Sequence, residues 1–218
     1  PPRSTLFPYT TLFRSLSIIL FTPLAGLLVL LLIPGTNKGL VRIWANLVGF
    51  IGFLISLPLL SRFQNGAPGF QFEEKVSWIP ALGVSYHIGV DGISLLLIML
   101  TTLMGFIAIL SSWTAITERV KEYYIFLLIL QTGMLGAFMA LDFLLFFLFW
   151  EVMLVPMYFL IGICGSAHRL YSAIKFFLST LVGSVVMLLG LLALYFYTHS
   201  VTGVYSFYVT QLKMLNVP

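Results

Sequence analysis

The chain has 218 residues, of which 60% are hydrophobic and only 8% are charged, and its mean hydropathy is +1.07. A soluble domain of this length needs more charge to cover its surface, so the composition excludes that class and predicts an all-α, polytopic membrane protein. The net charge of +4 comes mostly from lysines and arginines in short loops. It therefore indicates orientation in the bilayer and gives no sign of a nucleic-acid-binding surface.

Residues 1–15 do not resemble the rest of the chain. Positions 5–15 read TLFPYTTLFRS, which resembles the in-frame translation of a widely used DNA sequencing adapter. We therefore expect residues 1–15 to be a sequence-assembly artefact, and residues 16–218 to be the transmembrane part of the protein. The alternative is a short arm at the membrane interface, with Arg14 as a flanking charge.

Six apolar runs follow, and they approach or exceed the length that a helix needs to cross a hydrocarbon core of roughly 30 Å. We expect the helices at residues 16–33, 40–60, 92–113, 123–141, 142–163 and 172–197. Pro34 and Gly35 close the first helix, and Asp91 and Asp142 can cap the third and fifth. The longest polar stretch, residues 61–90, is expected to form a small hairpin-like cap at the membrane surface.

Basic loop residues fall into two groups on opposite sides of the expected helices. One group is Lys38, Arg42, Arg119, Lys121 and Arg169, and the other is Arg62, Lys75 and Lys213. The positive-inside rule places the larger group in the cytoplasm, and the N-terminus and residues 61–90 outside. Small residues in the second and third helices, such as Gly49 and Gly105, should allow the helices to pack closely.

Glu151 is a lone carboxylate in the apolar stretch at residues 143–162. An acidic residue at a helix centre costs about 2.5 to 3.5 kcal/mol on insertion scales, so it is normally kept for a partner or a water-filled path. Asp142 starts the helix, which places Glu151 roughly 13 Å further along, near mid-membrane. Pro156 should kink the helix and free the carbonyl of Val152, which can hold water. We interpret Glu151 as a proton-transfer site, the alternative being a salt bridge that only packs helices.

Two further residues are candidates for a proton path. Lys175 shares a helical face with Ser172, Ser179 and Gly183, which predicts a polar stripe toward the bundle interior. Its alternative role is to extend to the lipid headgroups. His168 lies in a loop where it can relay protons or simply add positive charge. Gln131 is expected to form a hydrogen bond between helices.

The sequence offers no metal site and no internal disulfide. Its three histidines, His87, His168 and His199, are expected in separate loops without ligand spacing, and Cys164 is the single cysteine. It also lacks a glycine-rich phosphate loop and a cysteine cluster.

Three segments resemble a known family. They are FFLFWEVMLVPMYFLIG at residues 146–162, AIKFFLSTLVGSVVMLLG at residues 173–190 and YHIGVDGISLLLIMLT at residues 86–101. Together they resemble the M subunit, an antiporter-like membrane subunit of bacterial proton-pumping NADH:quinone oxidoreductase (respiratory complex I). The resemblance covers essentially everything after residue 15.

The resemblance carries several expectations. It implies a fold of about fourteen helices, of which this chain would hold about six and stop before the seventh, and it makes Glu151 the essential carboxylate of the fifth helix, paired with a lysine on the seventh. It implies no cofactor in this chain, since NADH, flavin, iron–sulfur clusters and quinone would belong to partner subunits. The expected partners are the antiporter-like L and N subunits, the lipid bilayer and protons, in the bacterial inner membrane.

Two other interpretations remain open at this stage. The chain could be the D-type subunit of a multi-subunit sodium/proton antiporter, or a subunit of a membrane-bound hydrogenase, both of related architecture. A different class is a structural membrane scaffold without an ion path.

Overall fold

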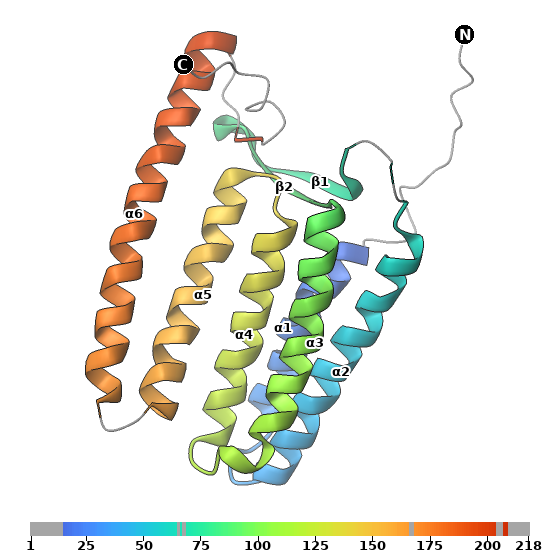
Figure 1. Cartoon of the computed structure of the whole chain (residues 1–218), viewed down its shortest axis with the longest axis vertical. Helices are drawn as coiled ribbons and strands as arrows, with labels where there is room; N and C mark the ends of the chain where they lie inside the picture. Colours follow the sequence, from blue (N-terminus) through green and yellow to red (C-terminus); the bar gives the residue numbers. More distant parts are fainter. Residues whose placement is uncertain (1–14, 65, 67–68, 166–167, 204–206, 209–218) are drawn as a thin grey trace.

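The computed structural model describes residues 15–64, 66, 69–165, 168–203 and 207–208, and shows a helix bundle with a β-hairpin across one end (Figure 1). Apart from Ser15, the segment expected to be an artefact lies outside the described residues. The helices are α1 (Ser15–Leu32), α2 (Lys38–Arg62), α3 (Gly92–Ala115), α4 (Val120–Met139), α5 (Phe143–Cys164) and α6 (Arg169–Thr202). All six expected helices are thus confirmed, with ends displaced by only a few residues.

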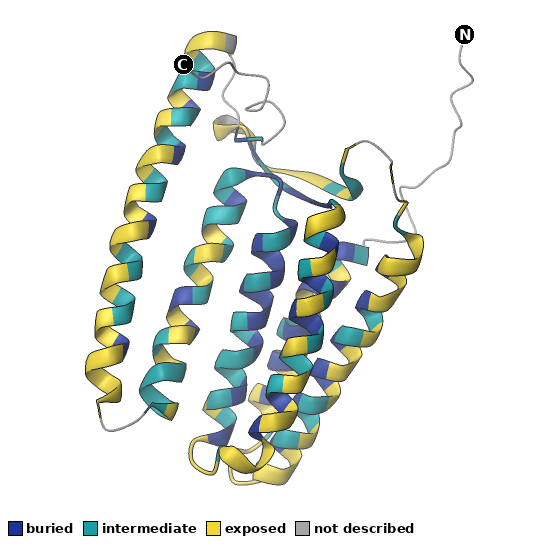
Figure 2. Ribbon diagram, viewed as in Figure 1, coloured by how far each residue is buried: buried dark blue, intermediate teal, exposed yellow. Residues whose placement is uncertain are grey.

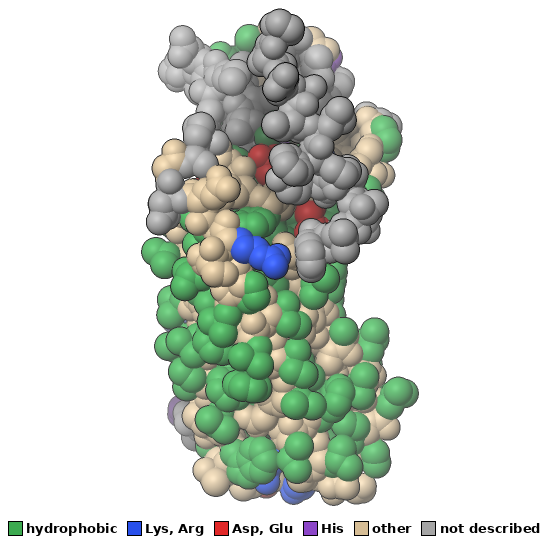
Figure 3. Space-filling view, turned by 90° about the vertical axis from the view of Figure 1, so that its right-hand side faces the viewer, with side chains coloured by type: hydrophobic (Ala, Val, Ile, Leu, Met, Phe, Trp, Pro, Cys, Tyr) green, Lys and Arg blue, Asp and Glu red, His purple; other side chains and the backbone are tan. Residues whose placement is uncertain are grey.

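Each of these helices is long and apolar enough to cross a membrane. On the face that Figure 3 shows, hydrophobic side chains cover most of the height, and lysine and arginine side chains emerge at the lower edge. The loops between α1 and α2, α3 and α4, and α5 and α6 lie together at that end (Figure 1). The two-sided grouping of basic residues is therefore confirmed, except for Lys213, which lies outside the described residues.

The polar stretch before α3 forms the expected hairpin. Strands β1 (Gln71–Ile79) and β2 (Val84–Val90) pair antiparallel and are joined by the short helix η1 (Pro80–Leu82). Gly83 follows η1 with φ of 66°, a conformation that glycine adopts without strain. The carboxylate of Glu74 accepts hydrogen bonds from the backbone N–H groups of Leu16 and Ser17, so the hairpin also holds the start of α1.

Several helix ends are satisfied by side chains. Asp91 accepts a 2.7 Å hydrogen bond from the N–H of Ser94, which confirms it as the cap of α3. At the opposite end of the bundle, Lys121 Nζ donates hydrogen bonds to the carbonyls of Leu31 and Ile33, where α1 ends. Basic residues of the expected cytoplasmic group thus also pair with carbonyls that a helix end leaves without partners.

Helices α1 to α4 pack closely around each other. A Cβ atom added at Gly105 of α3 would lie 2.6 Å from Nε2 at the end of the Gln131 side chain in α4, so Gln131 packs directly against this glycine and would have to shift for a larger residue. Gln131 is buried, which confirms its place between the helices. The expected hydrogen bond is not found for its Oε1 atom, which has no partner among the described residues.

Candidate functional site

Glu151 lies in the first half of α5, well inside the span. Asp142 caps this helix by accepting hydrogen bonds from the N–H groups of Leu144 and Leu145, as expected. The Glu151 side chain is half-buried, and its Oε1 atom is buried with no hydrogen-bond partner among the described residues. A buried carboxylate oxygen without a partner costs free energy. This arrangement is typical of a functional group, whereas a packing salt bridge would place a basic partner beside the carboxylate.

The packing of α5 shows which way Glu151 faces. Cβ atoms added at Gly136 and Gly133 of α4 would collide with Phe149 and Met153, so these two positions mark the side of α5 against α4. Tyr158 marks the opposite side, where its ring meets that of Phe177 in α6 at 5.6 Å. Glu151 precedes Tyr158 by seven residues, two helical turns, and therefore shares the side that faces α6.

Ser184 of α6 lies at about the level of Glu151. The two helices run antiparallel (Figure 1), and Tyr158 pairs with Phe177, so stepping seven residues up α5 and seven along α6 reaches Glu151 and Ser184. Ser184 is only 3% exposed, and its hydroxyl donates to the carbonyl of Leu181. Its oxygen can still accept a hydrogen bond, for instance from a protonated carboxyl group. No sequence pattern marks this residue, because its level beside Glu151 follows from the contact between Tyr158 and Phe177, which only the structure shows.

Pro156 adds polar backbone near the carboxylate. It is buried within α5 and has no N–H, so the carbonyl of Val152 lacks its intrahelical partner, as expected. Val152 directly follows Glu151. The site therefore combines a carboxylate, a hydroxyl and a free carbonyl in an otherwise apolar surrounding, and these groups can accept, hold and pass a proton or a water molecule.

The structure does not place the predicted polar stripe of α6 against the other described helices. Ser172, Lys175, Ser179 and Gly183 are all exposed, and nothing lies within 4 Å of a Cβ built at Gly183. Phe177 fixes the rotation of α6 through its contact with Tyr158, and Lys175, two residues earlier, is turned about 200° away from that contact. The outward side of α6 is mostly exposed along its length (Figure 2). The packing of α6 against α5 thus decides which face of α6 is exposed.

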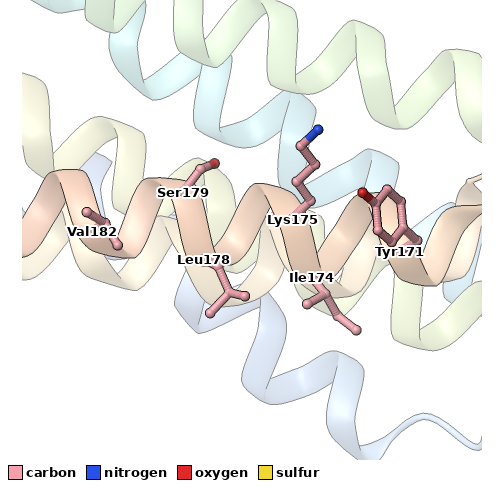
Figure 4. A pocket seen from close by; sticks show the side chains of 6 residues that line it. All are labelled: Tyr171, Ile174, Lys175, Leu178, Ser179 and Val182. Atoms are coloured by element: carbon pink, nitrogen blue, oxygen red, sulfur yellow. The ribbon is translucent and has the colours of Figure 1, made fainter.

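Lys175 instead lines an open groove of about 490 Å³ on α6. Its ammonium group and the Ser179 hydroxyl extend away from the side taken by Ile174 and Leu178 (Figure 4). Along the helix, Lys175 lies nine residues, roughly 13 Å, from Ser184. The structure therefore does not bring Lys175 next to Glu151.

His168 lies at the start of α6, exposed and without a capping hydrogen bond. Glu151 is 13 residues from the end of α5 at Cys164, a rise of roughly 20 Å, so His168 is also remote from the carboxylate. Cys164 itself is a free, exposed thiol. No cluster of three metal-ligating side chains occurs within the described part of the chain.

Comparisons with known proteins show which family this chain resembles. Residues 140–216 match the family described as NADH:quinone oxidoreductase/Mrp antiporter, TM. NADH-ubiquinone oxidoreductase chain 4 of Chondrus crispus is 43% identical over 188 residues, which cover 86% of this chain and 38% of that protein. NADH-quinone oxidoreductase subunit M of Rhodobacter capsulatus is 46% identical over 186 residues, covering 83% and 35%.

A solved structure shows the same arrangement. Respiratory complex I from Thermus thermophilus contains a chain that superposes with a TM-score of 0.73 at 26% identity, covering 90% of this chain and 38% of that one. The chain thus spans about two fifths of the length of the relatives it matches. These comparisons confirm the similarity to the M subunits of NADH-quinone oxidoreductases over most of the chain.

Proposed function

We propose that this chain forms part of a proton-translocating membrane subunit of an NADH:quinone oxidoreductase, with Glu151 as the proton-accepting group of one half-channel. The proposal is carried by the Oε1 atom of Glu151, which is buried without a partner among the described residues and lies on the side of α5 that faces Ser184. Acidic side chains inside a membrane span commonly mark pathways for protons or ions, which supports this assignment.

Similarity to the M subunits supports the wider setting of this proposal. Electron transfer from NADH to quinone would take place in partner subunits. Those subunits would hold the redox groups, none of which is expected in this chain. The antiporter-like L and N subunits would be its membrane neighbours, and a bacterial inner membrane its location. Lys175 and His168, both exposed near the expected cytoplasmic end, stay candidates for proton entry from that side, away from direct contact with Glu151.

The test is Glu151→Gln in the complete subunit within the assembled complex. Moving one proton against 100 mV costs about 2.3 kcal/mol, and this work must pass through a titratable side chain, which glutamine does not provide. We expect most proton uptake by sealed vesicles to be lost during NADH:quinone turnover, with assembly intact. Glu151→Asp should retain part of the activity because the charge survives with a shorter reach.

Glu118→Gln is the matched control, because it makes the same chemical change on an exposed loop between α3 and α4. It should pump at the native rate. Native pumping per electron pair in an assembled Glu151→Gln complex would contradict the proposal and leave Glu151 a packing residue of a scaffold.

A further inference from the structure

His87 of β2 is a buried histidine at the hairpin end of the bundle. It is 2% exposed, and its backbone carbonyl accepts a 2.9 Å hydrogen bond from the N–H of Leu141. The ring lies 4.8 Å from that of Tyr208. The two ring nitrogens have different surroundings: Nε2 is 2.9 Å from Glu73 Oε2, whereas Nδ1 is buried with no hydrogen-bond partner among the described residues.

Glu73 connects this buried ring to solution. Its side chain is 40% exposed, although one carboxylate oxygen touches the 2%-exposed histidine. Glu73 lies at an irregularity of β1, where one extra residue separates the pairs Gln71–Val90 and Glu74–Ile88. Phe72 in this bulge has φ of 56°, a strained value for a phenylalanine. Bulges of this kind re-aim side chains, and this one coincides with the contact to His87.

Other charged groups surround His87 from the elements packed around it. Asp142, at the corner between α4 and α5, is 1% exposed and accepts a hydrogen bond from the N–H of Ser85. Burial raises the pKa of its carboxyl, against the lowering effect of its N–H partners and of His87. Lys75 is paired with His87 across the hairpin, and its ammonium lies 5.1 Å from the centre of the Tyr208 ring. Asp91 is engaged as the cap of α3.

The geometry points to a second proton-transfer site, in which His87 and Glu73 pass protons between the buried corner of α4 and α5 and the solution on the hairpin side. This inference rests on the proposed function. Histidine changes its charge in the neutral pH range, and its two nitrogens let a proton enter on one side of the ring and leave on the other. In the outward step, Nε2 of the imidazolium gives its proton to Glu73 Oε2, which leaves a neutral ring and a neutral acid.

Glu73 and the His87 ring then return to their starting protonation states. Glu73 releases its proton to water and becomes a carboxylate again. The neutral ring keeps its remaining proton on Nδ1, the buried nitrogen without a partner among the described residues. The ring must therefore rotate before the next cycle, so that this N–H turns toward Glu73 and the bare nitrogen turns toward the interior. The bare nitrogen then accepts the next proton from the interior, and the ring returns to the imidazolium. The relay covers only this last step. Roughly 13 Å of α5 separate Asp142 from Glu151, and the relay does not include proton transfer over this distance.

The experiment uses Glu73→Gln and His87→Gln in the complete subunit within the assembled complex. Sealed vesicles are prepared with different pH values on the hairpin side, and the initial rate of proton pumping is measured. Each variant should pump at least about tenfold more slowly, because a positioned proton donor or acceptor is lost. The dependence of the rate on hairpin-side pH should flatten as well. Glu118→Gln should keep the native rate and the native pH dependence.

Two patterns of results separate the inference from the proposed function. If Glu151→Gln stops pumping while Glu73→Gln keeps the native rate and pH dependence, the relay is overturned and the proposed function stands. If Glu151→Gln pumps normally, the proposed function fails, and the relay fails with it. Should His87→Gln not assemble, Glu73→Gln decides, since a side chain that is 40% exposed can be replaced with little loss of packing.

Discussion

Helices α1 and α6 are equally apolar but are buried to different extents. Their most apolar windows have the same mean hydropathy of 2.4, yet 39% of the α1 window is buried inside the protein against 11% of the α6 window. Helix α1 packs among α2 and α4, whereas α6 contacts mainly α5 (Figure 2). Hydropathy thus identifies a helix that crosses the membrane and does not say whether protein or lipid covers it. The proposed site lies at the border between these two regions.

The first prediction compares two glycines, one from each region. A Cβ at Gly26 of α1 would lie 2.3 Å from a methyl carbon of Val48, whereas a Cβ at Gly183 of α6 meets nothing within 4 Å. Gly26→Leu should lower the free energy of unfolding by about 3 kcal/mol, because a packed interface cannot take the added volume. Gly183→Leu should change it little. Thermal unfolding in detergent measures both, and equal losses would show that the two regions are packed alike.

The second prediction concerns Asp142, which joins the hairpin to α5. Asp142→Ala removes the helix cap and leaves the N–H of Ser85 without a partner, at a cost of about 2 kcal/mol in unfolding free energy. Asp142→Asn should cost less, because an asparagine oxygen can still cap α5 while its amide cannot accept from Ser85. An Asn variant as unstable as the Ala variant would contradict this division of roles.

The pH dependence of the Asp142 contribution follows from its pKa, which burial raises above the ordinary value of 3.8. The folded state then holds this proton more tightly than the unfolded state does. The contribution is fully present below pH 3.8 and is lost as the pH rises through the raised value. The unfolding free energy of the native chain, measured relative to that of Asp142→Asn, should therefore decrease as the pH rises through this range.

The third prediction tests the register between α5 and α6. Ser184→Ala should slow proton pumping in the complete subunit by up to about tenfold, the effect of one modest hydrogen bond. Ser179→Ala is the matched control, because Ser179 is exposed on the other side of the same helix. Equal effects of the two changes would mean that Ser184 is not the serine beside Glu151.

The fourth prediction has the smallest effect on the protein itself and concerns its orientation. Arg119→Cys and Lys75→Cys are made in the complete subunit with Cys164→Ser and with any cysteine outside this chain also replaced by serine, so that single thiols lie at opposite ends of the bundle. An impermeant reagent added outside intact cells should label position 75 and leave position 119 unlabelled. The reverse pattern would invert the orientation that the positive-inside rule predicts.

The sequence by itself determined the number and approximate limits of the helices, the hairpin, the caps at Asp91 and Asp142, and the isolation of Glu151. These features depend on local signals: apolar length, capping residues and one charge in an apolar run. The similarity to M subunits was also readable, since it depends on contiguous motifs.

The tertiary structure alone decided which side of each helix faces protein. Lys175 and Gly183 share a face by spacing, but the contact between Tyr158 and Phe177 turns that face outward and brings Ser184 toward α5. The pairing of His87 with Glu73 likewise depends on a bulge that the polar stretch did not reveal. In a chain that is apolar all round, periodicity carries little information on rotation, because lipid and protein interior accept the same side chains.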